Sequence, residues 1–382
     1  MMRAVAQKEY RPFSPAPAQF GLINLLKAVA AQLIVLHHLA FYGPMADYVR
    51  PVFPDLIGWL GDSARIAVQV FLVIGGFLAA KSLAPAGLPH HARPFNAIWR
   101  RYAKLAPPFI VATLIAAAAS ALAARWMTHD SISAPVTLAQ LAAHAVLLHG
   151  VLDYPSLSAG AWYVAIDFQL YAALVLLLWL AGLLVGKRAV QWLMPLVVAT
   201  GITLSLLHFN VDAGWDNWAP YFFGSYGLGL MAWWASDPQR KPGAVTLIVL
   251  AALLPALVAL VLEFRSRIAL ALVVACVLLV AGRIKTSSSG CAWQAINGLG
   301  KISYAIFLIH FPVCLLVNAA FTRFVPADPA WQALGMLVAW STSVLAGAMF
   351  HRWVEAPLGR GVQRLGEKIR LQGDLGDRRR YG

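Results

Sequence analysis

A lysine and a histidine on one apolar stretch are the first residues whose types and spacing could do chemistry. The stretch Leu22–Tyr42, LINLLKAVAAQLIVLHHLAFY, is long enough to cross a bilayer, which takes about 20 apolar residues. Lys27 and His38 are eleven residues apart, so on a helix they lie about 20° apart around the axis and about 16 Å apart along it. His37 lies about 80° from Lys27 on the other side. The spacing therefore predicts a membrane helix with Lys27 and His38 on one face.

Ionisable side chains within a membrane need a reason to be there. A lysine at the centre of such a helix costs about 2.5–3.5 kcal/mol on insertion scales, and residues of this kind are functional by default. The alternative interpretation is that Lys27 snorkels to the cytoplasmic headgroups, while His38 is an interfacial residue near the opposite surface. The helix alone leaves both interpretations open.

A carboxylate on a second apolar stretch is the natural partner for the histidine. The segment from Trp162, WYVAIDFQLYAALVLLLWL, carries Asp167 with Tyr163 and Tyr171 four residues to either side, on the same helix face. If this segment enters from the outer side, Asp167 lies at a depth similar to that of His38. An imidazole and a carboxylate that meet in a dry site form a general base with an orienting partner, and we expect that pair here. The alternative is that the two groups only satisfy each other between helices.

Two further sets of residues have helical spacing. Arg100, Arg101 and Lys104 lie at the expected cytoplasmic start of the third apolar span, which suits phosphate binding. Their alternative role is that of a positively charged membrane anchor. Ser303 and His310 are seven residues apart and share a helix face. His310 is either a site residue or a hydrogen-bonded core histidine.

The composition decides what class of fold must position these residues. The chain has 382 residues, 60% hydrophobic and 12% charged, with a mean hydropathy of +0.69, whereas a soluble domain is about 25% charged. We therefore expect an all-α polytopic membrane protein with about ten transmembrane helices. The spans are expected at residues 22–42, 64–83, 104–124, 161–183, 190–208, 217–235, 244–262, 266–282, 300–321 and 331–353. A shorter stretch, 136–152, holds His144 and His149 and is expected to be re-entrant or surface-lying.

The distribution of charge predicts the orientation of the chain. With the N-terminus inside, 23 of the 30 Lys and Arg residues are cytoplasmic, six are outside and the last is Lys27, as the positive-inside rule requires. Both termini are therefore expected in the cytoplasm, and the net charge of +14 reflects topology, not nucleic-acid binding. Three cysteines without ligand spacing imply neither a disulfide nor a metal site. We expect a cytoplasmic segment 1–20, a transmembrane domain 21–358 and a basic cytoplasmic tail 359–382.

Together these stretches resemble the acyltransferase-3 family of integral membrane acyltransferases. The resemblance covers Phe20 to Arg360 and consists of six motifs in order. They are the basic residue and histidine of the first helix (Lys27, His38), a phenylalanine-rich Val70–Leu78, the basic Arg100–Pro107, an aromatic and acidic Trp162–Tyr171, Gly300–Pro312 with Ser303 and His310, and a closing Glu355 and Pro357. The chain departs from the family pattern where Lys27 replaces an arginine, Asp167 replaces a glutamate and Phe168 replaces a second acid.

The resemblance implies transfer of an acyl group, often acetyl, from cytoplasmic acyl-CoA to a hydroxyl of an outward-facing glycan or lipid-linked sugar. His38 and Asp167 would be catalytic together with Lys27. The substrate-binding residues would be Arg100, Arg101, Lys104, Tyr163, Tyr171, Ser303 and His310. No tightly bound cofactor is implied, and the location would be a bacterial-type inner membrane. His38 would act either as a base on the acceptor hydroxyl or as a nucleophile that carries the acyl group.

Two other classes of function fit the apolar spans. Polar residues that face a cavity would also serve a transporter or exporter of a glycan or amphiphile. A structural or assembly subunit of an envelope-polysaccharide machine would not need His38 and Asp167 for its function. Consumption of a thioester by the purified protein distinguishes the enzyme from both.

Overall fold

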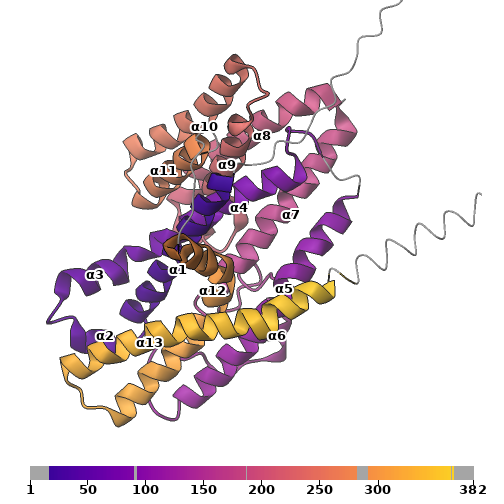
Figure 1. The fold of residues 1–382 in the computed structure, drawn as a ribbon. Coiled ribbons are helices and arrows are strands. Elements are labelled where there is room, and N and C mark those ends of the chain that lie inside the picture. Colours follow the sequence, from indigo (N-terminus) through magenta and orange to yellow (C-terminus); the bar gives the residue numbers. More distant parts are fainter. Residues whose placement is uncertain (1–16, 90–92, 186, 282–290, 363, 365–382) are drawn as a thin grey trace, which may run out of the picture.

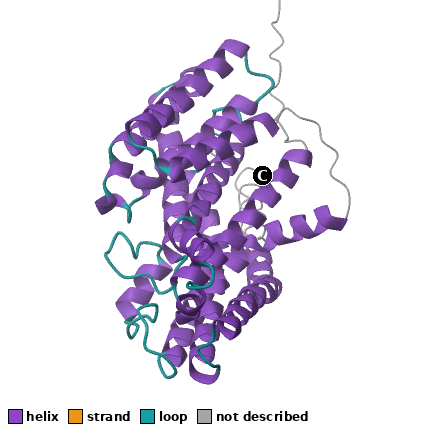
Figure 2. Cartoon of the chain, turned by 90° about the vertical axis from the view of Figure 1, so that its left-hand side faces the viewer, coloured by secondary structure: helices purple, strands orange, loops and turns teal. Residues whose placement is uncertain are grey.

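The described part of the chain is helical throughout. The computed structural model describes residues 17–89, 93–185, 187–281, 291–362 and 364, and these contain no strand (Figure 2). The expected all-α class is therefore confirmed for these residues. The expected N-terminal segment 1–20 and basic tail 359–382 lie largely outside them.

Thirteen α-helices, three short 3₁₀ helices and one π-helical turn follow one another along the described chain (Figure 1). The α-helices are α1 Pro17–Phe41, α2 Pro44–Val49, α3 Pro54–Asp62, α4 Val68–Leu83, α5 Pro94–Ala123, α6 Leu138–Ala145, α7 Ala161–Leu184, α8 Lys187–Leu207, α9 Ala219–Ser236, α10 Pro242–Leu262, α11 Ser266–Ala281, α12 Cys291–Phe324 and α13 Pro329–Phe350. The 3₁₀ helices are η1 Ala64–Ala67, η2 Phe209–Val211 and η3 Ala213–Trp215, and the π-helical turn is η4 His351–Glu355. Several helices begin with a proline, which is favourable there because the first turn leaves its N–H groups unpaired.

Eight helical segments of the described chain are long and apolar enough to cross a membrane. They are Gly21–Phe41, Ala64–Leu83, Pro94–Ala123, Ala161–Leu184, Ala189–Val211, Pro242–Leu262, Trp293–Phe324 and Pro329–Val362. Two expected spans are not among them: α11 has only 16 residues, and α9, with 18 residues, is less apolar because it is rich in glycine, serine, tyrosine and tryptophan. The number of about ten spans and the cytoplasmic position of the termini therefore stay predictions.

The segment expected to be re-entrant or surface-lying forms the short helix α6 and the turn after it. It lies against two long helices. The hydroxyl of Tyr102 on α5 donates a hydrogen bond to the carbonyl of Ala145 at 2.8 Å, and the amide of Gln169 on α7 donates to the carbonyl of Leu147 at 3.0 Å. The 136–152 region is thus part of the helix bundle.

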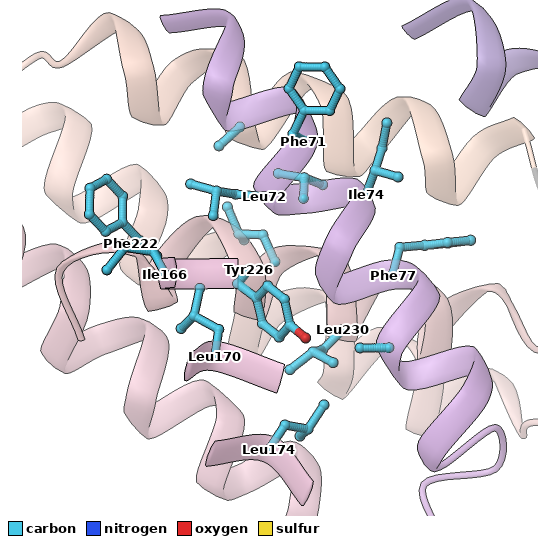
Figure 3. Packing of buried hydrophobic residues seen from close by; sticks show 14 of the residues in the cluster. Phe71, Leu72, Ile74, Phe77, Ile166, Leu170, Leu174, Phe222, Tyr226 and Leu230 are labelled. Carbon is cyan, nitrogen blue, oxygen red and sulfur yellow. The ribbon is translucent and has the colours of Figure 1, made fainter. Parts of the chain in front are cut away.

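Glycines allow two pairs of helices to pack backbone against backbone. A Cβ atom at Gly76 of α4 would lie 1.9 Å from the carbonyl oxygen of Tyr226 on α9, and one at Gly229 of α9 would lie 2.0 Å from that of Val73. Figure 3 shows the ring of Tyr226 among apolar side chains that belong to α4 and α7. On α12, a Cβ at Gly300 would lie 2.4 Å from the carbonyl oxygen of Asn24 on α1. Small residues of this kind are what close packing between membrane helices requires.

Helix α12 connects the parts of the bundle that carry the candidate site residues. It packs against α1, α5 and α13, and α5 in turn packs against α7 (Figure 1). The side chains of His38, Arg101 and Asp167 therefore come from helices that are joined through direct contacts. This arrangement sets which of the predicted residues can meet.

Candidate functional site

His38 and His310 form a buried pair of imidazoles between α1 and α12. Nδ1 of His38 lies 2.6 Å from Nε2 of His310, and Nδ1 of His310 lies 3.1 Å from the carbonyl oxygen of Ile306. The ring planes differ by only 7° and the ring centroids are 4.9 Å apart, so the two nitrogens meet edge to edge in a common plane. His38 is 7% exposed and His310 is fully buried. We call this unit the histidine pair.

The hydrogen bonds of the histidine pair fix the tautomer of both neutral rings. A carbonyl oxygen can only accept, so Nδ1 of His310 carries its hydrogen and Nε2 of the neutral ring is an acceptor. Nδ1 of His38 must then donate to it, which leaves the lone pair of His38 on Nε2. A neutral imidazole held in one tautomer by a hydrogen bond on its other nitrogen is the form that a general base or a nucleophile requires. Because His38 lies in the last turn of α1, the helix dipole also favours the positive charge that it acquires on protonation.

His37 has a different environment from its neighbour. Its Nδ1 lies 2.9 Å from the carbonyl oxygen of Leu60 on α3, so this ring ties α1 to the helix on its outer flank. The two adjacent histidines therefore point to different helices. The helix geometry expected from the sequence, in which His38 is the candidate and His37 lies off that face, agrees with these contacts.

Asp167 pairs with Arg101 on α5, not with His38. Nη2 of Arg101 lies 2.5 Å from Oδ2 of Asp167, and the guanidinium also lies over the ring of Tyr171, 5.1 Å from its centroid. The aspartate side chain is 7% exposed and the arginine side chain 28%. A Cβ atom at Gly75 would lie 3.0 Å from Oδ1 of Asp167, so α4 closes one side of the carboxylate.

The expected pairing of His38 with Asp167 is therefore wrong, and the reason is the assumed depth. We expected Arg101 at the cytoplasmic surface and Asp167 near the outer one, but a contact of 2.5 Å between their side chains requires a common depth. Helix α5 has 30 residues and is about 45 Å long, more than the roughly 30 Å hydrocarbon core of a bilayer. A residue two turns from the start of so long a helix need not lie at a membrane surface.

Aromatic side chains separate the histidine pair from the Arg101–Asp167 ion pair. The ring of Phe307, one turn before His310, lies 5.2 Å from that of Tyr163 and 6.0 Å from that of Phe71. Phe307 and Phe71 are buried. Tyr163, which we expected to bind substrate, thus packs in this aromatic layer.

Lys27 lies at the edge of the second polar group. It is half-buried, and its electrostatic neighbours are Glu355 and Lys104. Within the described residues it has no ion pair or hydrogen bond, whereas Glu355 accepts from or pairs with His351 at 2.9 Å. Tyr304 is in electrostatic range of Glu355 and also of the Arg101–Asp167 pair, so these charges adjoin. We call Lys27, Arg101, Lys104, Asp167 and Glu355 the ion cluster.

The three basic residues expected to act together have separate environments. Arg100 and Lys104 are exposed, while Arg101 turns inward to Asp167. Ser303 is buried and its hydroxyl donates to the carbonyl of Gly300 in its own helix at 2.9 Å, and among the described residues it makes no hydrogen bond to another predicted site residue. The site thus divides into the histidine pair and the ion cluster.

Three tyrosines beside these groups were not among the predicted site residues. Tyr226 and Tyr304 lie in electrostatic range of the ion pair, and no spacing within their own helices could have related them to it. Tyr42 lies beside His38, with ring centroids 5.4 Å apart. Its position four residues after His38 on α1 was a readable signal.

A helical protein with a buried pair of imidazoles and a separate group of cations has side chains of the kinds needed for group transfer. Residues 21–351 match the family described as "Acyltransferase domain". The chain belongs to this acyltransferase-3 family, and its eight long apolar helical segments fit the multi-pass membrane protein that the family implies.

Other similarities are more limited. "Regulator of hypoxia-inducible factor 1" from Caenorhabditis elegans is 26% identical over 167 residues, which cover 40% of this chain and 33% of that protein. The chain thus spans about a third of the length of that relative. The comparison with solved structures gives no match.

Proposed function

We propose that this protein transfers an acyl group, acetyl in the simplest case, from acyl-CoA to a hydroxyl of a glycan or lipid-linked saccharide. The observation that carries the proposal is the histidine pair. A neutral, oriented imidazole with its lone pair on Nε2 of His38 can accept the proton of a hydroxyl that attacks a thioester. His310 takes the role that the carboxylate of Asp167 was expected to have.

The donor side of the proposal rests on the cations of the ion cluster. Arg101 is neutralised by Asp167, so the groups offered to the CoA phosphates are Lys27, Lys104 and the exposed Arg100. Lysine contacts a phosphate as a point charge, without the bidentate geometry of arginine. Lys27 and His38 are separated by about 16 Å along α1, a distance that the extended pantetheine arm of CoA would bridge.

The reaction needs two proton transfers at one nitrogen. The acceptor oxygen attacks the thioester carbonyl carbon while Nε2 of His38 takes its proton; the C–S bond then breaks and the imidazolium returns a proton to the thiolate. In the other route, Nε2 of His38 attacks the carbonyl carbon and the C–S bond breaks, with CoA leaving as its thiolate. The acceptor oxygen then attacks the acyl carbon, the N–C bond breaks, and the proton of the acceptor hydroxyl passes to the released Nε2 and on to the thiolate. Both routes use the tautomer that His310 imposes. A hydroxyl acceptor, an outward-facing saccharide and a bacterial inner membrane belong to this proposal.

The test is thiol release from acetyl-CoA by protein purified into lipid nanodiscs, with and without a saccharide acceptor. We expect His38→Ala to abolish turnover and His37→Ala to keep most of it, because His37 contacts only Leu60 of α3 in the described hydrogen bonds. His310→Ala, which frees the His38 tautomer, should lose most of the turnover at an unchanged donor KM. An exporter would release no thiol from acetyl-CoA, and such a result would replace the enzyme with the transport alternative.

A further inference from the structure

The hydroxyl of Tyr42 lies at the reacting end of α1 and has no described partner. Tyr42 extends the helix by one residue, since its N–H donates to the carbonyl of His38 at 2.9 Å. Its ring lies 5.4 Å from the His38 ring, centroid to centroid. The residue is half-buried, and among the described residues its hydroxyl makes no hydrogen bond. A phenol titrates near pH 10, so this hydroxyl carries its proton at neutral pH.

The ring of Tyr42 is held in place by its neighbours. It makes edge-to-face contacts with Phe41 at 4.8 Å and with Phe311 at 5.6 Å between centroids. It also packs against the apolar cluster of Ala123 and Leu315. A donor whose orientation is fixed before the substrate arrives is what stabilisation of a developing charge requires.

A second polar side chain at this end of α1, besides the histidines, is Asn318, and it already has hydrogen bonds. Asn318 is fully buried against Gly43, and its amide oxygen accepts from the N–H of Met45 at 3.3 Å. Its amide nitrogen donates to the carbonyl of Cys314 at 3.0 Å. Asn318 therefore uses both its amide oxygen and one amide hydrogen inside the described structure, whereas the hydroxyl of Tyr42 has no described hydrogen-bond partner.

We propose that Tyr42 donates a hydrogen bond to the acyl carbonyl oxygen as it becomes an oxyanion during transfer at His38. This inference rests on the proposed acyl-transfer function and adds a catalytic residue to it. When a nucleophile adds to the thioester carbonyl carbon, the π electrons of the C=O bond move to the oxygen, and they return when the C–S bond breaks. The C-terminal end of a helix disfavours negative charge, so the oxyanion beside the end of α1 needs a local donor. Both routes through His38 form this oxyanion.

The test removes one oxygen atom and keeps the ring. Tyr42→Phe retains the contacts with Phe41 and Phe311, and we expect kcat for thiol release from acetyl-CoA to fall about 10²–10³-fold with little change in donor KM. Tyr48→Phe, at a 40% exposed tyrosine on α2, is the matched control and should behave as wild type. Incorporation of 3-fluorotyrosine at position 42, a more acidic donor of nearly the same shape, should change kcat where a purely structural role would not.

The outcomes separate this inference from the function on which it rests. If wild-type protein in nanodiscs releases no thiol from acetyl-CoA with any acceptor, the proposed function fails and the role of Tyr42 fails with it. If wild type is active and Tyr42→Phe keeps kcat within about threefold, or raises only KM, the role of Tyr42 alone is refuted. Equal protein yield and elution from size exclusion for Tyr42→Phe and wild type exclude loss of fold as the cause of a lower kcat.

Discussion

Asp167→Asn should destabilise the protein, because it leaves the inward-turned guanidinium of Arg101 without its anionic partner. Removal of one member of a buried ion pair costs about 3–5 kcal/mol. The aspartate side chain is 7% exposed, but the arginine side chain keeps 28% exposure, so water screens part of the loss. We therefore expect about 3 kcal/mol. Arg101→Gln should cost a similar amount, since it leaves a carboxylate with no described ion-pair partner at its place against Gly75.

A double-mutant cycle measures the interaction free energy between Arg101 and Asp167. The free energy of unfolding is obtained by denaturant titration in detergent micelles for the two single variants and for Arg101→Gln/Asp167→Asn. The double variant should lose much less than the sum of the singles, because it buries two neutral amides in place of one unpaired charge. Arg100→Gln, at the exposed neighbouring position, is the control and should change stability by less than about 0.5 kcal/mol. Additive losses, or a fully stable Asp167→Asn that lacks turnover, would refute the reasoning and return Asp167 to the chemistry.

Two further predictions concern the donor and the pH. Neutralising Arg100 and Lys104 together should raise the KM for acetyl-CoA more than it lowers kcat, since charges far from the reacting carbon contribute mostly uniform binding; a donor titration checks this. Burial, and secondly the neighbouring His144, lower the pKa of His149 to about 3. The folded protein holds His149 neutral, and the pKa of a free histidine is about 6.5. Above pH 6.5 His149 therefore costs the fold nothing. As the pH falls from about 6.5 towards 3, the unfolded chain binds a proton that the folded protein does not, and the free energy of unfolding decreases by at most about 5 kcal/mol. Thermal denaturation of His149→Phe, which keeps the stack on His144, should depend less steeply on pH than that of wild type.

The sequence was sufficient for those features that depend on a single helix. Eight of the ten expected apolar spans, the common face of Lys27 and His38, and the different direction of His37 follow from helix period and hydropathy. The turn that carries His144 and His149 was recognised as unlike a span. Its stacked rings, 4.0 Å apart, could not be predicted, because they depend on a turn in which Leu147 has a φ of 60°.

Contacts between helices were beyond the sequence, and the failure of the His38–Asp167 pair shows why. Equal depth was inferred from distances to expected membrane surfaces, which requires helices that are upright and of bilayer length. Helix α5 has 30 residues and α12 has 34, so both exceed that length. A carboxylate on α7 could meet an arginine, a lysine or a histidine on three different helices, and only packing selected Arg101.

The charge balance of the ion cluster suggests a role for Lys27, which has no ion-pair partner among the described residues. The charges of Arg101 and Asp167 cancel across their contact. Lys27 has Glu355 and Lys104 as its electrostatic neighbours, so the ion cluster holds three cations and two carboxylates, and the exposed Arg100 adds a further cation. Unbalanced charge in a low-dielectric setting is costly until a counter-charge arrives, and a ligand that carries phosphates supplies it. If the proposed acyl-CoA is the donor, its phosphates should therefore bind at those cations that have no ion-pair partner among the described residues, about 16 Å along α1 from the histidine pair.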